Sequence, residues 1–154
     1  KADSSEFTFL YNQRGHQALR LIAVDAETGT ARALIDEVSP TFIDYAGKFF
    51  LQTVAGGREA LWMSERSGWN HLYRYDLSTG RVLNPITQGE WVVRGVDRVD
   101  EATRTLWFRA SGMDADQDPY QVHFCRIGFD GKGLVRLPRG NGSHSVTYSP
   151  DGKY

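Results

Sequence analysis

The chain has 154 residues, with 18 lysines and arginines against 19 aspartates and glutamates, which gives a formal net charge of −1. This balance gives no electrostatic reason to expect nucleic acid or an anionic membrane as a partner. No apolar run approaches the roughly 18 residues that a membrane span needs. Cys125 is the single cysteine, which excludes an intrachain disulfide and a cysteine-based zinc site.

Short runs of alternating apolar and polar residues fill the chain, and no segment has the periodicity of a helix. Glycine, aspartate, asparagine and serine interrupt these runs about every 8 to 12 residues, which is typical of an all-β meander. In chain order, we expect strands at 7–11, 19–24, 30–35, 48–54, 60–64, 71–75, 81–87, 91–96, 105–110, 122–129, 133–138 and 143–149.

A repeat of about 50 residues organises these strands. The sequence VDAETG at 24–29 recurs as YDLSTG at 75–80, a spacing of 51 residues, and Gly131 follows after another 51. HLYRY at 71–75 likewise recurs as HFCRI at 123–127. Four strands within such a period predict the blades of a β-propeller, whereas a β-sandwich stays an alternative.

The predicted fold class is therefore all-β, a β-propeller segment of about three blades that are four-stranded antiparallel meanders. Residues 1–36 supply the last three strands of one blade, 37–88 and 89–140 form full blades, and 141–154 hold the first strand of a further blade. Because a propeller ring typically needs four to eight blades, we expect the chain to be a piece of a longer one. The alternative is a homo-oligomer in which the strand at 143–149 of one copy supplements the first blade of another.

The candidate interface lies at one end of these sheets. A meander places its turns alternately at two ends, and one end collects the longer and less regular connecting segments. That end is expected to carry Glu65, Arg66 and Trp69 in one turn, and Glu90 and Trp91 in the next connection. Binding surfaces are usually found on such loops, although the two tryptophans also suit a packing role.

No catalytic residue is predicted in the chain. Ser64 and Ser67 lie close to His71 in sequence, but a serine nucleophile also needs a strained turn such as G-x-S-x-G, which does not occur here. His71 recurs as His123, which favours a repeated structural role for both histidines.

No metal or cofactor is predicted either. The acidic segment 114–119 imitates the start of an EF-hand loop, but the required glycine and glutamate are replaced by Pro119 and Cys125. A looser calcium site and a solvated acidic loop stay open for this segment. The four histidines lack the spacing of a metal site, and the glycine-rich stretch 140–144 precedes a predicted strand, unlike a phosphate-binding loop.

One stretch carries a family resemblance. SERSGWNHLY at 64–73 resembles a recurring hairpin in the N-terminal β-propeller of dipeptidyl peptidase IV-type serine peptidases, within the prolyl oligopeptidase group. Three further stretches are similar to that family in order and spacing: TQGEWVV at 87–93, LWFRASG at 106–112 and HSVTYSPDGKY at 144–154. SPTFID at 39–44 also resembles some bacterial members.

The resemblance implies that the parent protein carries an eight-bladed propeller over a C-terminal α/β-hydrolase domain with a Ser-Asp-His triad. Peptide substrates would lose an N-terminal dipeptide in the enclosed cavity, preferentially after proline or alanine, and the protein would be periplasmic or secreted. The paired-glutamate motif that binds the substrate's amino group has no match here, nor has the triad. The chain would then be a non-catalytic scaffold and gate; the alternative is a stand-alone propeller for protein–protein interaction.

Overall fold

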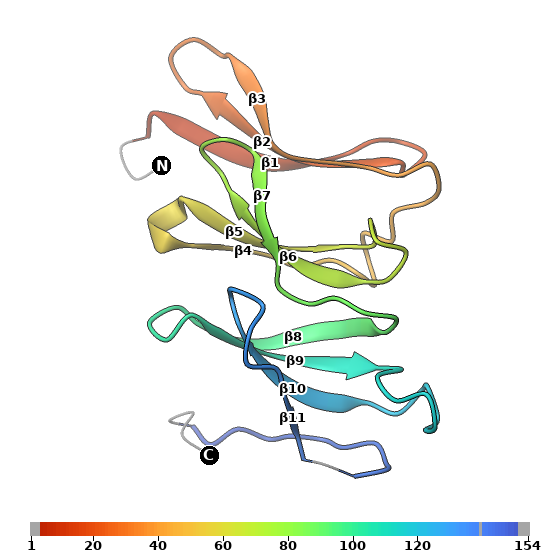
Figure 1. Cartoon of the computed structure of the whole chain (residues 1–154). Helices are drawn as coiled ribbons and strands as arrows, with labels where there is room; N and C mark the ends of the chain where they lie inside the picture. The colour runs from red at the N-terminus through yellow and green to blue at the C-terminus, as the bar shows by residue number, and fades with distance from the viewer. Residues whose placement is uncertain (1–3, 139, 151–154) are drawn as a thin grey trace.

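The computed structural model describes residues 4–138 and 140–150. Three antiparallel sheets are stacked one above another, and the chain passes through them in order (Figure 1). Within the described residues, these sheets hold three, four and four strands, and the single helical element is a short 3₁₀ turn, η1 (Ala55–Gly57). The prediction of an all-β fold is confirmed.

Each sheet is a meander of strands that neighbour each other in sequence. The first sheet contains β1 (Glu6–Asn12), β2 (Ala18–Asp25) and β3 (Ala31–Val38). The second contains β4 (Leu51–Val54), β5 (Glu59–Ser64), β6 (His71–Asp76) and β7 (Arg81–Pro85). The third contains β8 (Val92–Asp100), β9 (Thr105–Ser111), β10 (His123–Gly128) and β11 (Val135–Leu137).

Eleven of the expected strands overlap these elements, but the twelfth does not form. Residues 143–149 belong to no strand, and among the described residues no strand forms a ladder with them. Residues 151–154, the rest of the segment predicted to begin a further blade, lie outside the described residues. β3 extends to Val38, two residues past the predicted blade boundary, and the division into blades stays a prediction.

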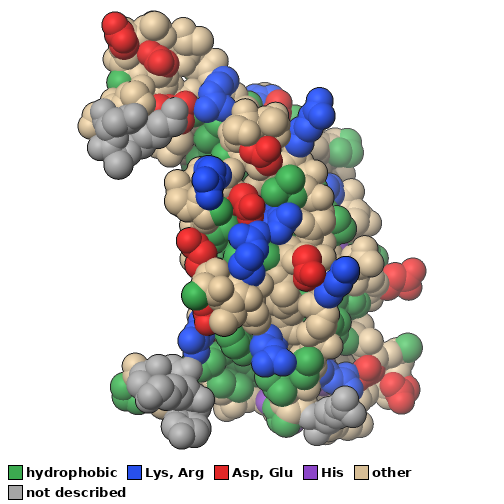
Figure 2. All heavy atoms as spheres, turned by 60° about the vertical axis from the view of Figure 1, so that its left-hand side comes forward, with side chains coloured by type: hydrophobic (Ala, Val, Ile, Leu, Met, Phe, Trp, Pro, Cys, Tyr) green, Lys and Arg blue, Asp and Glu red, His purple; other side chains and the backbone are tan. Residues whose placement is uncertain are grey.

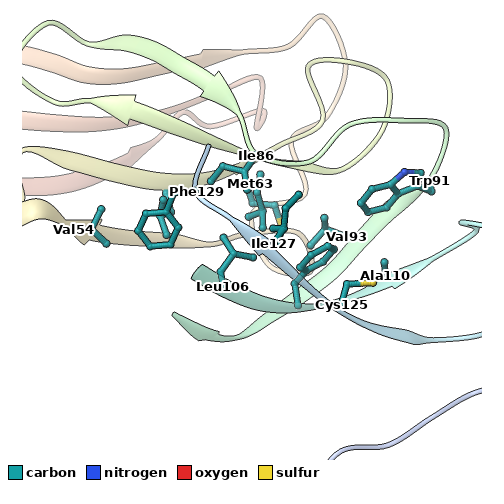
Figure 3. Close-up of a cluster of buried hydrophobic side chains, with 13 residues drawn as sticks. Val54, Met63, Ile86, Trp91, Val93, Leu106, Ala110, Cys125, Ile127 and Phe129 are labelled. Carbon is teal, nitrogen blue, oxygen red and sulfur yellow. The ribbon is translucent and has the colours of Figure 1, made fainter. Parts of the chain in front are cut away.

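The middle sheet is buried on both faces because its side chains alternate between two cores. On β5, Ala60 and Trp62 point into a cluster shared with the first sheet, whereas Leu61 and Met63 point into a cluster shared with the third. Figure 3 shows the cluster between the second and third sheets. In it, Ile127 of β10 and Phe129, the second residue along from it, pack against side chains of the second sheet. The alternate side chains that indicated strands in the sequence thus also pack the middle sheet against both of its neighbours.

The repeated glycine turns bring each sheet against the preceding one. Gly80 and Gly131 both have a positive φ, +70° and +79°, which favours glycine. A Cβ atom on Gly80 would lie 3.3 Å from the carbonyl oxygen of Leu34, and one on Gly131 would lie 2.9 Å from that of Pro85. The glycines of the 51-residue repeat therefore serve the packing between sheets as well as the turns.

The two ends of the stack differ in character. The end on the left of Figure 1 carries tight turns, and Figure 2 shows basic and acidic side chains interspersed over it. At this end Glu59 of the second sheet forms an ion pair of 2.8 Å with Arg104 of the third. The end on the right carries the longer connections, including 39–50, 65–70, 86–91 and 112–122.

Candidate functional site

The predicted interface residues gather around the hairpin tip between β5 and β6, residues 65–70. The tip lies beside the connections 39–50 and 86–91 that join neighbouring sheets. Glu65, Arg66 and Trp69 belong to the hairpin, and Glu90 and Trp91 to the second connection. The five residues have very different surroundings in the structure.

Arg66 is partly exposed, and its guanidinium is tied down by a network that joins the first two sheets. Its Nη2 atom donates to the carboxylate of Glu37 at the end of β3 and to the hydroxyl of Tyr75 on β6. Its Nε atom donates to Ser64 Oγ at 2.9 Å, and Ser64 Oγ donates to Glu37 Oε1 at 2.6 Å. The guanidinium also lies 4.6 Å from the ring centroid of Tyr73.

The charges of this network are matched within the protein. Burial acts to lower the pKa of Arg66, but the Glu37 carboxylate and the Tyr75 hydroxyl outweigh it, so the pKa lies above its ordinary value. Burial raises the pKa of Tyr75 despite the nearby guanidinium. Arg66 is therefore a charged residue in a neutral cluster, and it positions the hairpin.

Ser64 and His71 face each other on paired strands without forming a catalytic pair. They are register partners on β5 and β6. The hydroxyl of Ser64 donates to Glu37, whereas both ring nitrogens of His71 contact other groups. A serine nucleophile needs a base to accept its proton, and here the histidine is directed elsewhere.

His71 connects the hairpin strand to the following connection. Its Nε2 lies 2.9 Å from the carbonyl oxygen of Gly89, so this nitrogen donates, and Nδ1 accepts from the hydroxyl of Thr87 at 3.0 Å. The same Thr87 hydroxyl accepts from the backbone N–H of Leu72 at 3.0 Å. Burial lowers the pKa of His71, with the Gly89 bond acting against it, and so favours the neutral ring.

Trp91 is a core residue in this structure. Only 9% of its surface is exposed, its ring packs edge-on against His71 at 4.9 Å, and it stacks with Phe108 at 6.1 Å. Gly89 fits beneath the indole, since a Cβ there would lie 2.4 Å from Trp91 Nε1. The two family-like stretches, 64–73 and 87–93, thus meet at this histidine and tryptophan.

The remaining three candidates are at the surface. Trp69 is 41% exposed at the hairpin tip, and Glu90 is also exposed. Glu65 forms an exposed ion pair with Lys48, with 2.6 Å between Oε1 and Nζ. Together with the partly exposed Arg66, they are the candidates whose side chains reach the surface.

A cavity of about 600 Å³ lies beside the hairpin, between the first and second sheets. Glu37, Asp44 and Lys48 line it together with Phe42 and the hairpin residues. An exposed aromatic group stands nearby, in which His16 stacks on Tyr45 at 4.7 Å and meets Phe42 edge-on at 5.3 Å. The hairpin motif does not predict that these aromatic residues lie beside it. The family-like stretch at 39–44, which includes Phe42, was the one sequence feature that pointed to this region.

The described residues offer no group of side chains for the metal sites considered above. Within residues 4–138 and 140–150, no group of three His, Cys, Asp or Glu side chains is placed to hold a metal ion. In the acidic segment, Asp114 forms an ion pair with Arg136, and Asp118 caps its own turn by accepting from the N–H of Tyr120 at 2.9 Å. No helix in the described part of the chain is long and apolar enough to span a membrane.

Stacked meanders of three, four and four strands with repeated turn and histidine positions define the chain as a portion of a β-propeller. The sequence matches the dipeptidyl peptidase IV (DPP IV) N-terminal region over residues 2–154, and the chain belongs to that family. Dipeptidyl peptidase 4 of Arthroderma otae is 28% identical over 94 residues, which cover 60% of this chain and 12% of the relative. The chain thus spans a small part of its full-length relatives.

Solved structures agree with the fold. Dipeptidyl peptidase 4 of Porphyromonas gingivalis superposes with a TM-score of 0.72 at 22% identity, covering 90% of this chain and 19% of that one. A putative dipeptidyl aminopeptidase IV from Bacteroides ovatus gives 0.74 at 17% identity, covering 99% and 24%. A putative TolB from Agrobacterium tumefaciens gives 0.56 at 17% identity, covering 88% and 46%. At these identities the likeness establishes the fold alone.

Proposed function

We propose that this chain is the non-catalytic propeller portion of a dipeptidyl peptidase IV-like serine exopeptidase, which removes N-terminal dipeptides from peptides. Its role is to scaffold a C-terminal α/β-hydrolase domain of the same parent protein and to gate the access of peptides to it. The observation that carries the proposal is the family match over residues 2–154. A periplasmic or secreted parent is part of this proposal and rests on the resemblance to the family alone.

The geometry of the hairpin end supports a contact role there. The Glu37–Arg66 network and the His71–Gly89 bond fix the base of the hairpin, while Glu65 and Trp69 stay at the surface. A surface on a rigid base loses little conformational entropy on binding, which suits a contact with a neighbouring domain or a peptide. We therefore place the gating contact at this end.

The test compares this chain with the full-length protein that contains it. With Gly-Pro-p-nitroanilide as substrate, the full-length protein should release nitroaniline and should be inactivated by a serine-directed fluorophosphonate. Residues 1–154 alone should give no release above buffer. Turnover by the isolated chain, or an inactive full-length protein that lacks any G-x-S-x-G turn, contradicts the proposal; the second result favours a stand-alone interaction module.

The gating role has its own readout in the full-length protein. Trp69→Ala should alter kcat/KM for a ten-residue peptide more than for the dipeptide anilide, because the longer substrate needs a wider passage and can contact more of the propeller. Glu27→Ala, in an exposed turn at the opposite end, is the matched control. Equal effects of Trp69→Ala on both substrates contradict a gating contact at this hairpin.

A further inference from the structure

Arg94 is a cation that the function proposed above does not use. It is the third residue of β8, and its side chain is exposed. Its guanidinium forms no hydrogen bond or ion pair with any described residue. By contrast, Arg109 on the neighbouring strand β9 pairs with Asp97 at 2.9 Å. The five N–H donors of the Arg94 guanidinium thus remain available to a ligand.

A hollow of about 310 Å³ lies beside Arg94, between the second and third sheets. It is lined by the start of β8, by the end of the hairpin tip 65–70 and by part of the connection 39–50. Ligand pockets typically measure about 300–1,000 Å³, so the hollow suits one small group rather than a whole peptide. Both sheets that bound it have four strands, and its lining residues lie between positions 44 and 94. The hollow is therefore far from both ends of the chain in sequence.

Lys48 brings a second positive charge to the hollow, and Asp44 brings a negative one. The ammonium of Lys48 pairs with Glu65, with 2.6 Å between Nζ and Oε1. The carboxylate of Asp44 accepts from the backbone N–H of Gly47 at 2.8 Å, within its own connection. Together with Arg94, these two are the charged residues in the lining, so positive charges outnumber negative ones there. Such a lining favours an anion.

Asn70 adds an unsatisfied acceptor to the same lining. The residue is only 1% exposed, and its Nδ2 atom donates to the carbonyl oxygen of Val93 at 2.7 Å. The N–H of Val93 donates in turn to the backbone carbonyl of Asn70 at 2.8 Å, so the amide is fixed against β8. Its Oδ1 atom is buried without a hydrogen-bond partner among the described residues. Because a buried acceptor without a donor is unfavourable, a ligand N–H that bonds to it would be stabilised.

We propose that this hollow is a subsite for a carboxylate of the peptide substrate, which Arg94 binds through charge-assisted hydrogen bonds. A guanidinium can donate two parallel hydrogen bonds to one carboxylate, which an ammonium cannot match. In a peptide, a backbone N–H lies close to a C-terminal or side-chain carboxylate, and it is the donor that Asn70 Oδ1 lacks. The inference rests on the proposed function, since the hollow lies at the end of the stack where the gating contact is placed.

The test measures kcat/KM of the full-length protein that contains this chain for Ala-Pro peptides of about four to ten residues, which span up to about 14 to 35 Å. Each peptide is made with a free C-terminal carboxylate and with a C-terminal amide. At the lengths that reach the hollow, kcat/KM should be about two- to fivefold higher for the free acid, as an exposed ion pair allows. This preference should disappear in Arg94→Met and shrink in about 0.5 M salt, which screens exposed charges.

A second series of peptides separates the two sources of a carboxylate. These peptides all carry a C-terminal amide and end in either glutamate or glutamine. A preference for glutamate that Arg94→Met removes assigns the subsite to side-chain carboxylates, whereas an effect confined to the free acids assigns it to the C-terminus. No carboxylate preference in either series, or a preference that Arg94→Met leaves unchanged, overturns the subsite.

Three further variants separate the subsite from altered structure. Arg94→Lys keeps the charge without the paired donors, so part of the preference should remain, and Asp44→Asn should increase it because the opposing charge is removed. Arg58→Met, which replaces an exposed arginine at the opposite end, should leave it unchanged. Equal losses for acids and amides in Arg94→Met indicate a structural role and contradict the subsite. A full-length protein that releases no dipeptide from any peptide contradicts the proposed function itself, and the subsite with it.

Discussion

Replacement of Arg66 by methionine tests whether the hairpin is held by its partly buried ion pair with Glu37. The side chain of Glu37 is only 9% exposed, and that of Arg66 is 31% exposed. Removing one partner of a buried pair typically costs about 3–5 kcal/mol, because the other charge stays buried without compensation. The partial exposure of Arg66 places Arg66→Met near the lower limit, a loss of about 3 kcal/mol in the free energy of unfolding.

The assay is urea denaturation followed by tryptophan fluorescence, with the double variant Glu37→Gln/Arg66→Met completing the cycle. Because the double variant leaves no buried charge, it should be about 2 kcal/mol more stable than the two single losses would give together. Lys48→Met removes the exposed pair with Glu65 and should cost less than about 1 kcal/mol. Additive single effects, or a loss in Arg66→Met as small as in Lys48→Met, refute the reasoning.

Three further outcomes follow from the packing between and within the sheets. Gly131→Ala should lower the free energy of unfolding, measured in urea, by about 2 kcal/mol or more, because φ is positive there and the new Cβ would lie 2.9 Å from the Pro85 carbonyl oxygen. Gly29→Ala is the control: φ is +72°, but a Cβ would meet no atom within 4 Å, so the loss should be only about 1 kcal/mol. Thr87→Val should cost about 1–3 kcal/mol in the same assay, because it leaves the N–H of a buried strand and the His71 ring without a partner. The lowered pKa of His71 means that unfolding takes up a proton, so stability should fall as the pH drops below about 6.5, and a Tm measured from pH 8 to pH 5 checks the sign.

The strands were predictable because the signal for them is local. Each expected range from 7–11 to 133–138 overlaps a strand, since alternation and turn residues within about ten positions determine a meander. The glycines of the repeat were likewise visible in the sequence. What their spacing alone could not indicate is the 2.9 Å approach of Gly131 to Pro85 of the preceding sheet.

The predicted strand at 143–149 did not form because strand pairing, unlike alternation, is not a local property of the sequence. This segment alternates like the other strands, but a strand also needs a neighbour with free backbone groups, and none is placed beside it in the described part of the chain. Its sequence therefore indicates a tendency to extend, whereas pairing depends on another segment. The start of the segment contacts Val122 through the N–H of His144 and the hydroxyl of Ser143.

How far each candidate interface residue is exposed depends on contacts between residues that are distant in the sequence. Arg66 and Trp91 lie in irregular segments with no strand pattern, where exposure is the ordinary expectation. The partner of Arg66 is 29 residues away on another sheet, and the ring beneath Trp91 belongs to a strand 20 residues earlier. Trp91 is therefore buried, whereas Arg66 stays partly exposed although its guanidinium binds Glu37. A search for the contact of this end should substitute Glu65, Trp69 and Glu90 first, then Arg66, and use the buried Trp91 as the control for altered geometry.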